Sequence, residues 1–265
     1  DALFGAHPVR GRLPVNVSES LKEGAGLDLD GSFRLGFSSP AEVGFDTTLL
    51  SAVDQLAYQA IDSMMTPGMR ILAARKGKIF YNKSFGYHTY DKKQQVKSSD
   101  IYDLASLTKI LGTLPLVIQS VQRGKLSLET TIAELIPEWS NSNKASISLR
   151  EMLSHYARLT PWIPFYKETL NKKGYPKKSI YQSKPSPKFS LTVANDLYLK
   201  SDFGEELYSQ IKESELLDTL SYKYSDFPYY ILKKYYETTS GLPYNKLIED
   251  SILKPLGLNR INFNP

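Results

Sequence analysis

Apolar residues recur at intervals of three and four after Asp46, and this spacing predicts an amphipathic helix. The apolar positions of this stretch are Leu49, Leu50, Val53, Leu56, Ala57, Ala60 and Ile61. A Pro-Gly pair at 67–68 ends the pattern, because neither residue continues a helix well. Two runs with alternating side chains follow at 70–75 and 78–87. The glycine between them, Gly77, suits a tight turn, so the pattern predicts a β-hairpin.

Helical spacing dominates the rest of the chain. Apolar residues from Ile110 to Val121 predict a helix that Gly124 closes. Further helices are expected at 148–159, 227–239 and 244–253, and a surface excursion rich in Pro, Lys and Tyr at 160–188. The order of helix, hairpin and then mostly helices predicts an α+β fold, with helices against an antiparallel sheet.

The first 45 residues have a different texture, with glycines at short intervals and little helical periodicity. We expect turns and linker there, with one short strand at 12–17. Two later strands form a poor independent sheet in water, and an uncovered edge invites pairing. We therefore expect an incomplete sheet that either leaves an open cleft or is completed by a neighbouring chain or a C-terminal segment missing here.

Composition narrows the function classes. The 265 residues are 41% hydrophobic and 23% charged, which allows a sizeable core in one or two domains and argues against global disorder. The net charge of +5 comes from scattered lysines, a pattern typical of a solvated basic surface and not of a nucleic-acid-binding face. The absence of cysteine excludes disulfides, thiolate zinc sites and a cysteine nucleophile. No apolar run is long enough to span a membrane, and no initiator Met or signal peptide is present, which suggests a processed or cut chain.

The chemistry is expected at Ser106 and Lys109, which share one face at the start of the predicted helix. The positive end of the helix dipole favours negative charge developing on the hydroxyl. A partly desolvated lysine loses its proton more easily and can act as a base toward the serine. Alternatively, Ser106 only caps the helix and Lys109 is solvated.

A second candidate group lies far downstream, where Tyr224 and Asp226 open another predicted helix. A tyrosine there can relay a proton between nucleophile and leaving group, and a carboxylate two residues later can orient the lysine. The alternative is that Tyr224 is an ordinary half-buried aromatic. His7, His88 and His155 are interpreted as structural, and neither a metal nor a cofactor is expected.

Residues 46–265 resemble the serine β-lactamase and penicillin-binding family, in its class C β-lactamase, esterase and D-aminopeptidase branch. The resemblance rests on Pro67-Gly68, Lys76-Gly77-Lys78, Phe85-Gly86-Tyr87, Ala105-Ser106-Leu107-Thr108-Lys109, the run at 124–128, the run at 147–155, Tyr224-Ser225-Asp226 and the run at 254–258. It implies a β-lactamase/transpeptidase-like α+β fold in which Ser106 is acylated while Lys109 and Tyr224 handle protons.

Three features depart from the family pattern. Asp226 stands where relatives usually carry Asn, which adds a charge beside the lysine. No Lys-Thr-Gly or His-x-Gly motif follows Asp226, so the strand that supplies one oxyanion-hole donor is expected to be absent. Loss of one such donor costs about 100- to 1000-fold in rate. The segment 155–159 reads His-Tyr-Ala-Arg-Leu where many relatives read His-Thr-Ser-Gly-Leu.

The segments 2–5 and 11–15 are similar to the end of family 3 glycoside hydrolases. Such enzymes, including β-N-acetylglucosaminidases, occur fused to β-lactamase-like domains in Bacteroidetes-type bacteria. The resemblance implies that residues 1–45 are the tail of a glycosidase domain plus linker. Residues 46–265 are then a serine β-lactamase-like domain whose C-terminal strands are missing, in an extracytoplasmic protein, periplasmic or on the cell surface.

The leading hypothesis is a serine hydrolase that acts through an acyl-enzyme on an amide or ester of a small molecule or peptide, related to the cell wall. A β-lactam, a D-amino-acid peptide and an ester stay open as substrates, and this fragment may be inactive. The alternative is a catalytically silent binding or structural module beside the glycosidase. A nucleic-acid-binding module would require salt-sensitive binding and is not expected.

Overall fold

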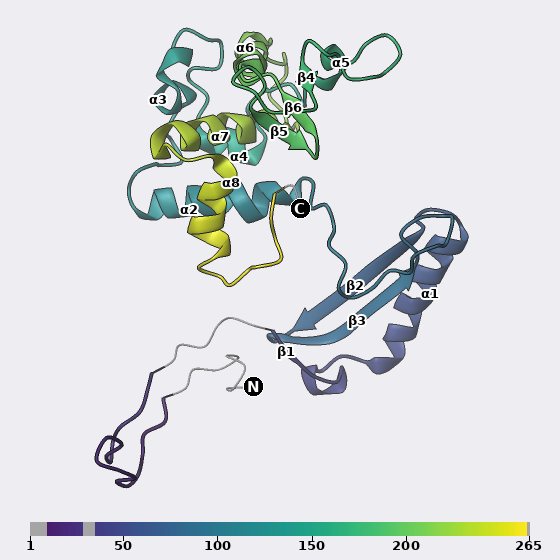
Figure 1. Cartoon of the computed structure of the whole chain (residues 1–265), viewed down its shortest axis with the longest axis vertical. Coiled ribbons are helices and arrows are strands. Elements are labelled where there is room, and N and C mark those ends of the chain that lie inside the picture. The colour runs from purple at the N-terminus through teal and green to yellow at the C-terminus, as the bar shows by residue number, and fades with distance from the viewer. Residues whose placement is uncertain (1–9, 29–34, 264–265) are drawn as a thin grey trace. The chain divides into compact units, whose positions relative to one another are not determined.

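The structure is a computed structural model that describes residues 10–28 and 35–263 (Figure 1). The chain divides into two compact units, Asp1–Asp103 and Leu104–Pro265, which are described separately. The predicted boundary between residues 45 and 46 falls within the first unit and stays a prediction. Among the described residues, no helix is both long and apolar enough to cross a membrane.

The first unit is built on the predicted hairpin. Strands β2 (Gly68–Arg75) and β3 (Lys78–Gly86) pair antiparallel from Gly68↔Gly86 to Arg75↔Lys78, with an irregularity between Ala73 and Ala74. Lys76 and Gly77 connect them with φ of 53° and 72°, and two consecutive positive φ angles match the right-handed twist of a tight hairpin. A two-residue strand, β1 (Gly36–Phe37), adds to β3 in parallel, so β2 is an edge of the sheet.

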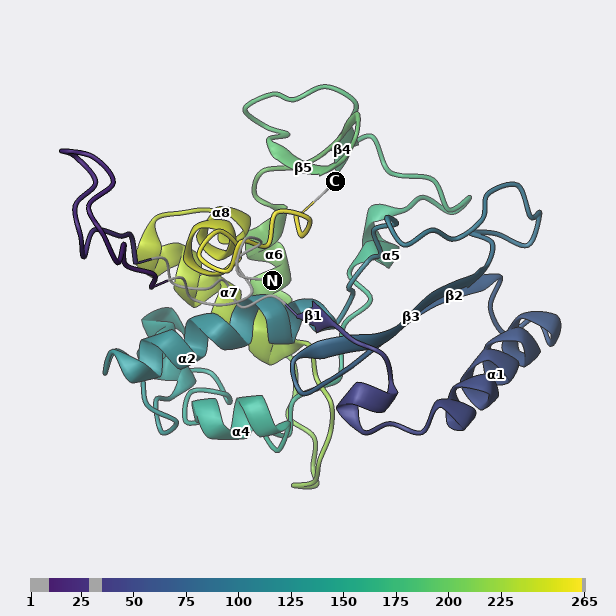
Figure 2. The same ribbon diagram turned by 90° about the horizontal axis from the view of Figure 1, so that it is seen from below.

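Helix α1 (Leu50–Asp62) runs along this sheet, and the 3₁₀ helices Ala41–Val43 and Thr47–Leu49 precede it (Figures 1 and 2). Its apolar face meets the sheet at a small core of Ala57, Tyr81 and Phe85. The glycine that begins β2 has a steric reason, because a Cβ on Gly68 would lie 2.4 Å from the carbonyl oxygen of Tyr87. Only a glycine allows the two backbones to approach this closely.

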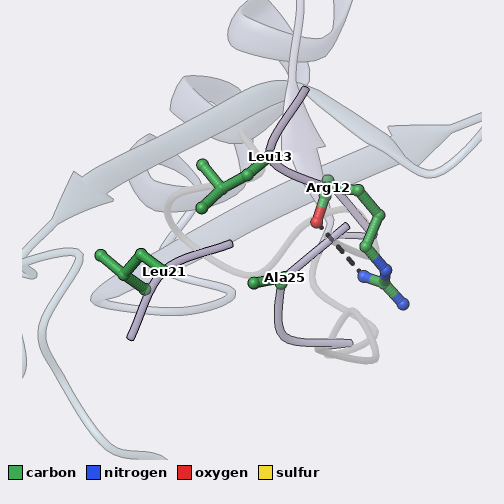
Figure 3. Close-up of a pocket in the computed structure, with 6 residues that line it drawn as sticks. Arg12, Leu13, Leu21 and Ala25 are labelled. Carbon is green, nitrogen blue, oxygen red and sulfur yellow. Dashed lines mark hydrogen bonds between the residues drawn. The ribbon is translucent and has the colours of Figure 1, made fainter. Parts of the chain in front are cut away.

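The strand predicted at 12–17 is wrong: the structure has no strand there. Leu13 does exchange backbone hydrogen bonds, donating to Ala25 O at 2.9 Å and accepting from Gly24 N at 2.8 Å. The pairing does not extend into a ladder, and Glu23 N donates at 2.8 Å to the side-chain Oδ1 of Asn16 instead. The segments instead enclose a hollow lined by Leu13, Leu21 and Ala25 (Figure 3).

The second unit is mainly helical. Its helices are α2 (Leu114–Gln122), α3 (Ile132–Leu135), α4 (Leu149–Ser154), α5 (Tyr166–Thr169), α6 (Phe203–Glu213), α7 (Phe227–Ser240) and α8 (Tyr244–Ile248), with a 3₁₀ helix at Pro137–Trp139 and π-helices at Lys109–Thr113 and Glu249–Leu253. Helices α2, α4, α7 and α8 surround one apolar core (Figures 1 and 2). Fully buried side chains at its centre include Leu149, Met152, Phe227 and Ile231.

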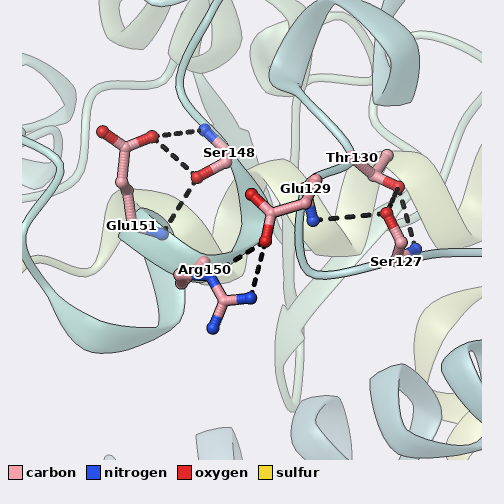
Figure 4. Close-up of polar contacts among 6 residues, drawn as sticks. All are labelled: Ser127, Glu129, Thr130, Ser148, Arg150 and Glu151. Atoms are coloured by element: carbon pink, nitrogen blue, oxygen red, sulfur yellow. Dashed lines mark hydrogen bonds and ion pairs between the residues drawn. The ribbon is translucent and has the colours of Figure 1, made fainter.

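Two short helices of this unit begin in the same way. Thr131 caps α3 and Ser148 caps α4, and each forms a capping box with the glutamate three residues later. A backbone bridge joins the two caps, and the Glu129–Arg150 ion pair at 2.6 Å lies beside them (Figure 4). These local bonds hold the loops between α2 and α4 and fix the start of α4.

Several predicted bounds change. The helix expected at 148–159 ends at Ser154, because His155 adopts a left-handed conformation. The helix expected at 244–253 is an α-helix that continues as a π-helix. The excursion at 160–188 contains α5 and β4 (Tyr181–Gln182), which joins β5 (Leu191–Ala194) and β6 (Leu197–Leu199) in a small sheet of order β4-β6-β5. The α+β class is confirmed.

Candidate active site

Ser106 lies in the turn that leads into the second unit's first helix. The turn is closed by hydrogen bonds from Leu107 N to Leu104 O at 2.8 Å and from Lys109 N to Ser106 O at 3.1 Å. Ala105 has a φ of 43°, a region that costs an L-residue with a Cβ about 1 kcal/mol or more. Strain of this kind persists only where the surroundings enforce it, so the backbone that presents Ser106 is held firmly.

Lys109 begins the π-helix Lys109–Thr113, which widens the first turn after the serine. Such π-turns within helices occur often at functional sites, because they shift side chains out of the regular helical spacing. The widened turn packs tightly on α8, since a Cβ on Gly112 would lie 2.7 Å from Ile248 Cδ1. A larger residue in place of Gly112 would require the tip of the Ile248 side chain to move.

The ammonium of Lys109 is the centre of the site. Its Nζ lies 2.9 Å from Ser106 Oγ and 2.8 Å from Asp226 Oδ1. It also lies 5.2 Å from the ring centroid of Tyr224 and 5.5 Å from that of Tyr229, within range of cation–π attraction. Only 15% of the Lys109 side chain is exposed. All four residues predicted for the site are therefore brought together by the second unit, although their catalytic roles stay predictions.

The charge of Lys109 is set by two opposing effects. Burial disfavours the ammonium, but hydrogen bonds to Asp226 and Tyr224 outweigh burial and raise the pKa of Lys109 above that of an ordinary lysine. Lys109 therefore keeps its proton at neutral pH. This differs from the expectation that desolvation frees the lysine to act as a base, because the carboxylate of Asp226 contacts the ammonium directly.

Tyr224 is shifted the opposite way. Its hydroxyl interacts with Lys109 and Ser106, and these hydrogen bonds lower the pKa of Tyr224 below that of an ordinary tyrosine. The Tyr224 oxygen interacts with both the serine hydroxyl and the lysine ammonium, and the lowered pKa makes its phenolate form easier to reach than in an ordinary tyrosine. The arrangement offers a nucleophile, an adjacent base and a cation that stabilises the basic form, which are the parts that nucleophilic catalysis by serine requires.

The segment that carries Tyr224 and Asp226 is fixed by the chain just after α4. Asp226 N donates to Pro161 O at 2.9 Å, and the buried Ser225 donates from Oγ to Thr160 O at 2.7 Å. Phe227 N, at the first residue of α7, donates to Ser225 Oγ at 3.2 Å, so this serine also holds the start of α7. Ser225 and Tyr229 were not predicted as part of the site. The spacing of Tyr229 from Asp226, one helical turn, was the only signal in the sequence.

The two histidines among the described residues lie in different settings. His155 is buried behind Tyr224, with ring centroids 4.6 Å apart. His88 belongs to the first unit, where its Nε2 lies 2.7 Å from Asp100 Oδ2. His7 is outside the described residues. Across residues 10–28 and 35–263, no cluster of three or more His, Cys, Asp or Glu side chains is placed to hold a metal.

A serine at a helix start, with lysine and tyrosine beside it in an α+β fold, defines the class of β-lactamase/transpeptidase-like proteins. A family model described as beta-lactamase matches residues 53–265. The chain belongs to the beta-lactamase family, a family of serine hydrolases.

Two relatives match most of this chain. The chain is 30% identical over 243 residues to a protein of Escherichia coli (strain K12) named "Putative D-alanyl-D-alanine carboxypeptidase", covering 86% of this chain and 50% of that protein. It is 25% identical to Protein flp of Staphylococcus aureus (strain COL), covering 80% of this chain and 38% of that protein. The chain thus spans half or less of the length of these two relatives.

Solved structures support the fold. A class C beta-lactamase has a TM-score of 0.58 at 20% identity, covering 80% of this chain and 50% of that one. EstCE1, a hydrolase with promiscuous acyltransferase activity, has a TM-score of 0.56 at 23% identity, covering 79% of this chain and 51% of that one. At these identities the likeness establishes the fold and not the substrate.

Proposed function

We propose that this chain carries the nucleophile of a serine hydrolase that works through an acyl-enzyme on Ser106. One observation carries the proposal: Lys109 Nζ lies 2.9 Å from Ser106 Oγ while it is paired at 2.8 Å with Asp226 and contacts Tyr224. An ordinary helix-capping serine needs no such group of partners. The chain's membership of the beta-lactamase family supports the same function.

The pKa directions favour Tyr224 as the base. The Tyr224 phenolate takes the proton from Ser106 Oγ, and Oγ forms a bond to the carbonyl carbon of the substrate. The proton then passes from Tyr224 to the leaving nitrogen or oxygen as the carbon–leaving-group bond breaks, which leaves an acyl-enzyme. In the second half, Tyr224 takes a proton from water while the water oxygen bonds to the acyl carbon. Tyr224 then returns the proton to Ser106 Oγ as the bond between Oγ and the acyl carbon breaks. Lys109 keeps its charge throughout and stabilises the phenolate.

The substrate class follows from the relatives and not from the site alone. We propose an amide or ester of the cell-wall type: a D-amino-acid peptide first, because of the carboxypeptidase-like relatives, with a β-lactam and a simple ester as alternatives. The proposal also includes an extracytoplasmic location, a family 3 glycosidase as the preceding domain and a strand that pairs with the β2 edge. Resemblance in the first 45 residues and the edge position of β2 support these three parts.

The test is the intact mass of the chain after incubation with a fluorophosphonate and, separately, with a penicillin. We expect one adduct per chain, abolished in Ser106→Ala and retained in Ser209→Ala, which removes an exposed helical serine of the same unit. A fluorophosphonate adduct without a penicillin adduct would favour the ester or peptide substrates. The absence of any adduct, together with binding of a D-amino-acid peptide, would show instead a catalytically silent binding module.

A further inference from the structure

His155 is a buried histidine that touches the site without contacting Ser106 in the described structure. It stands at the C-terminal end of α4 with φ of 60° and ψ of 29°. His155 N donates to Met152 O, and Tyr156 N donates to Glu151 O at 3.0 Å. This pair of bonds is the Schellman motif, in which the left-handed residue is usually glycine because a Cβ is disfavoured there. A histidine in this position therefore has a backbone cost that a glycine would not have.

Two contacts of His155 are made by its side chain and one by its backbone. Its Nδ1 accepts the backbone N–H of Ser225 at 3.2 Å, and its backbone oxygen accepts Lys223 N at 2.9 Å. Its ring packs against Tyr224 with centroids 4.6 Å apart and an interplanar angle of 40°. Ser225 is the residue between Tyr224 and Asp226, so a bond to its amide holds the backbone from which both site residues project. Ser225 is itself buried, so water does not replace this bond readily.

We propose that His155 is a positioning residue: its neutral ring accepts the Ser225 N–H and packs on Tyr224, which holds Tyr224 and Asp226 against Lys109. The proposal rests on the proposed function and deepens it, since it states that His155, at the C-terminal end of α4, keeps Tyr224 in contact with Lys109. It requires that Nδ1 carry no proton and that Nε2 carry the ring proton, because Nδ1 acts as an acceptor.

The charges around the ring agree with a neutral histidine. Lys109 and Asp226 are the charged groups that act on it, and the rings of Tyr222, Tyr224 and Tyr229 surround it. Burial and the nearby Lys109 ammonium lower the pKa of His155, against a smaller opposite effect from Asp226. The ring therefore stays neutral, and able to accept a hydrogen bond, at neutral pH.

Two substitutions separate the hydrogen bond from the packing. His155→Phe keeps a flat ring against Tyr224 but removes the acceptor. His155→Asn loses the ring, but its Oδ1 occupies a position similar to that of Nδ1, and Asn tolerates positive φ. If the hydrogen bond positions the segment, Asn should preserve the site and Phe should not.

The main readout is the titration of Tyr224, followed by NMR with labelled tyrosine rings and assigned with Tyr224→Phe. This measurement does not depend on whether Ser106 is acylated, so it is distinct from the test of the proposed function. We expect His155→Phe to raise the pKa of Tyr224 toward that of an ordinary tyrosine, and His155→Asn to leave it near the wild-type value. An unchanged Tyr224 pKa in folded His155→Phe, or an equal rise in both variants, would overturn the proposal.

A second measurement on the wild-type chain covers the case in which His155→Phe does not fold. Nitrogen NMR of the histidine rings, assigned with His155→Asn, should show His155 as the tautomer protonated at Nε2. A proton on Nδ1 at neutral pH would overturn the proposal outright. In a chain that reacts with fluorophosphonate, His155→Phe should also slow acylation by about 100-fold, the scale of loss that a misplaced catalytic group produces.

Discussion

Two lysines of the second unit show how differently burial acts in two regions of the same fold. Lys144, in the loop before α4, is fully buried, and its ammonium donates to Asn143 Oδ1 at 2.8 Å, Lys212 O at 3.1 Å and Ser214 O. All three partners are neutral. Desolvation dominates there, against a weaker effect from Glu215, and lowers the pKa of Lys144 to about 8. Lys109 is also largely buried, but its pKa moves upward.

The difference between the two lysines is the carboxylate of Asp226. Hydrogen bonds to neutral carbonyls satisfy an ammonium without restoring the solvation that burial removed. An adjacent carboxylate attracts the ammonium strongly enough to outweigh the cost of that lost solvation. The Lys144 region fastens the end of α6, because Lys212 and Ser214 carry carbonyls at that helix terminus. The Lys109 region instead uses a lysine held in its charged form beside a serine. Burial alone therefore does not identify a catalytic base in this chain.

The largest expected effect separates the two lysines by function. Lys109→Met should reduce the rate of Ser106 acylation by fluorophosphonate about 1000-fold, because Tyr224 loses the cation that stabilises its phenolate. Lys144→Met should leave that rate unchanged within experimental error. It should instead lower the free energy of unfolding in urea by about 1–3 kcal/mol, since it removes the ammonium donor from the carbonyls of Lys212 and Ser214, and Ser214 O is left with the weaker donor Asn143 Nδ2.

Each variant serves as the control for the other, because both replace a buried lysine by an apolar side chain of similar length. Equal loss of acylation in both would mean that Lys109 has no special role. If wild-type Ser106 does not react, the titration of Tyr224 still distinguishes them: Lys109→Met should raise the pKa of Tyr224 and Lys144→Met should not.

A smaller effect should appear in the pH dependence of stability. The pKa of Lys144 is about 8 in the folded chain and about 10.5 in the unfolded chain, so between these pH values the unfolded state binds more protons. The free energy of unfolding should therefore rise with pH across this window, by about 1–3 kcal/mol, and the gain should be lost as pH falls through about 8. The hydrogen bonds to three neutral oxygens favour the ammonium, so we expect the rise in the free energy of unfolding to fall in the lower part of this range.

The measurement is urea unfolding of the wild type and Lys144→Met at several pH values from 7 to about 11, compared as a difference so that other groups cancel. Lys109 has the opposite sign: its raised pKa stabilises the folded chain below the unfolded value, and that contribution is lost above it. A wild-type curve parallel to that of Lys144→Met would contradict the lowered pKa of Lys144.

The pattern of neighbouring residues was enough to predict the elements whose structure depends on short stretches of sequence. The hairpin followed from alternation and a glycine turn, and α7 from helical spacing. The predicted strand at 12–17 failed because the backbone pairing at Leu13 is not continued and Glu23 N donates to the Asn16 side chain instead. Helix α4 proved shorter because a histidine can adopt the left-handed conformation that ends it. The strands β4, β5 and β6 were missed because each has only two to four residues, although the run at 191–199, with Asn195-Asp196 between two apolar segments, carries a short hairpin signal.

The site was predicted by motif order and could not have been assembled from spacing alone. Ser106 and Asp226 are far apart in the chain, and nothing local indicates that Lys109 would contact both. The charge state of Lys109 was not predictable either, because it depends on a distance of 2.8 Å to Asp226 and not on the identity of its sequence neighbours. The contact between His155 and Ser225 is of the same kind.

The smallest expected effect tests the carboxylate that distinguishes the two lysines. Asp226→Asn keeps an oxygen that can accept from Lys109 but removes the negative charge. The pKa of Lys109 should fall, and so should that of Tyr224, which Asp226 holds up by repulsion of the phenolate. The pH at which Ser106 acylation reaches half its maximum should therefore move to lower pH, with the maximal rate changed by about tenfold or less.

Asp218→Asn is the matched control, because it makes the same change of charge at an exposed position of the same unit. It should leave the pH midpoint of acylation where it is in the wild type. A midpoint that stays fixed in Asp226→Asn, or moves equally in the control, would mean that Asp226 does not govern the charges of the site. Lys109 would then resemble Lys144, with its protonation set by burial and not by its carboxylate partner.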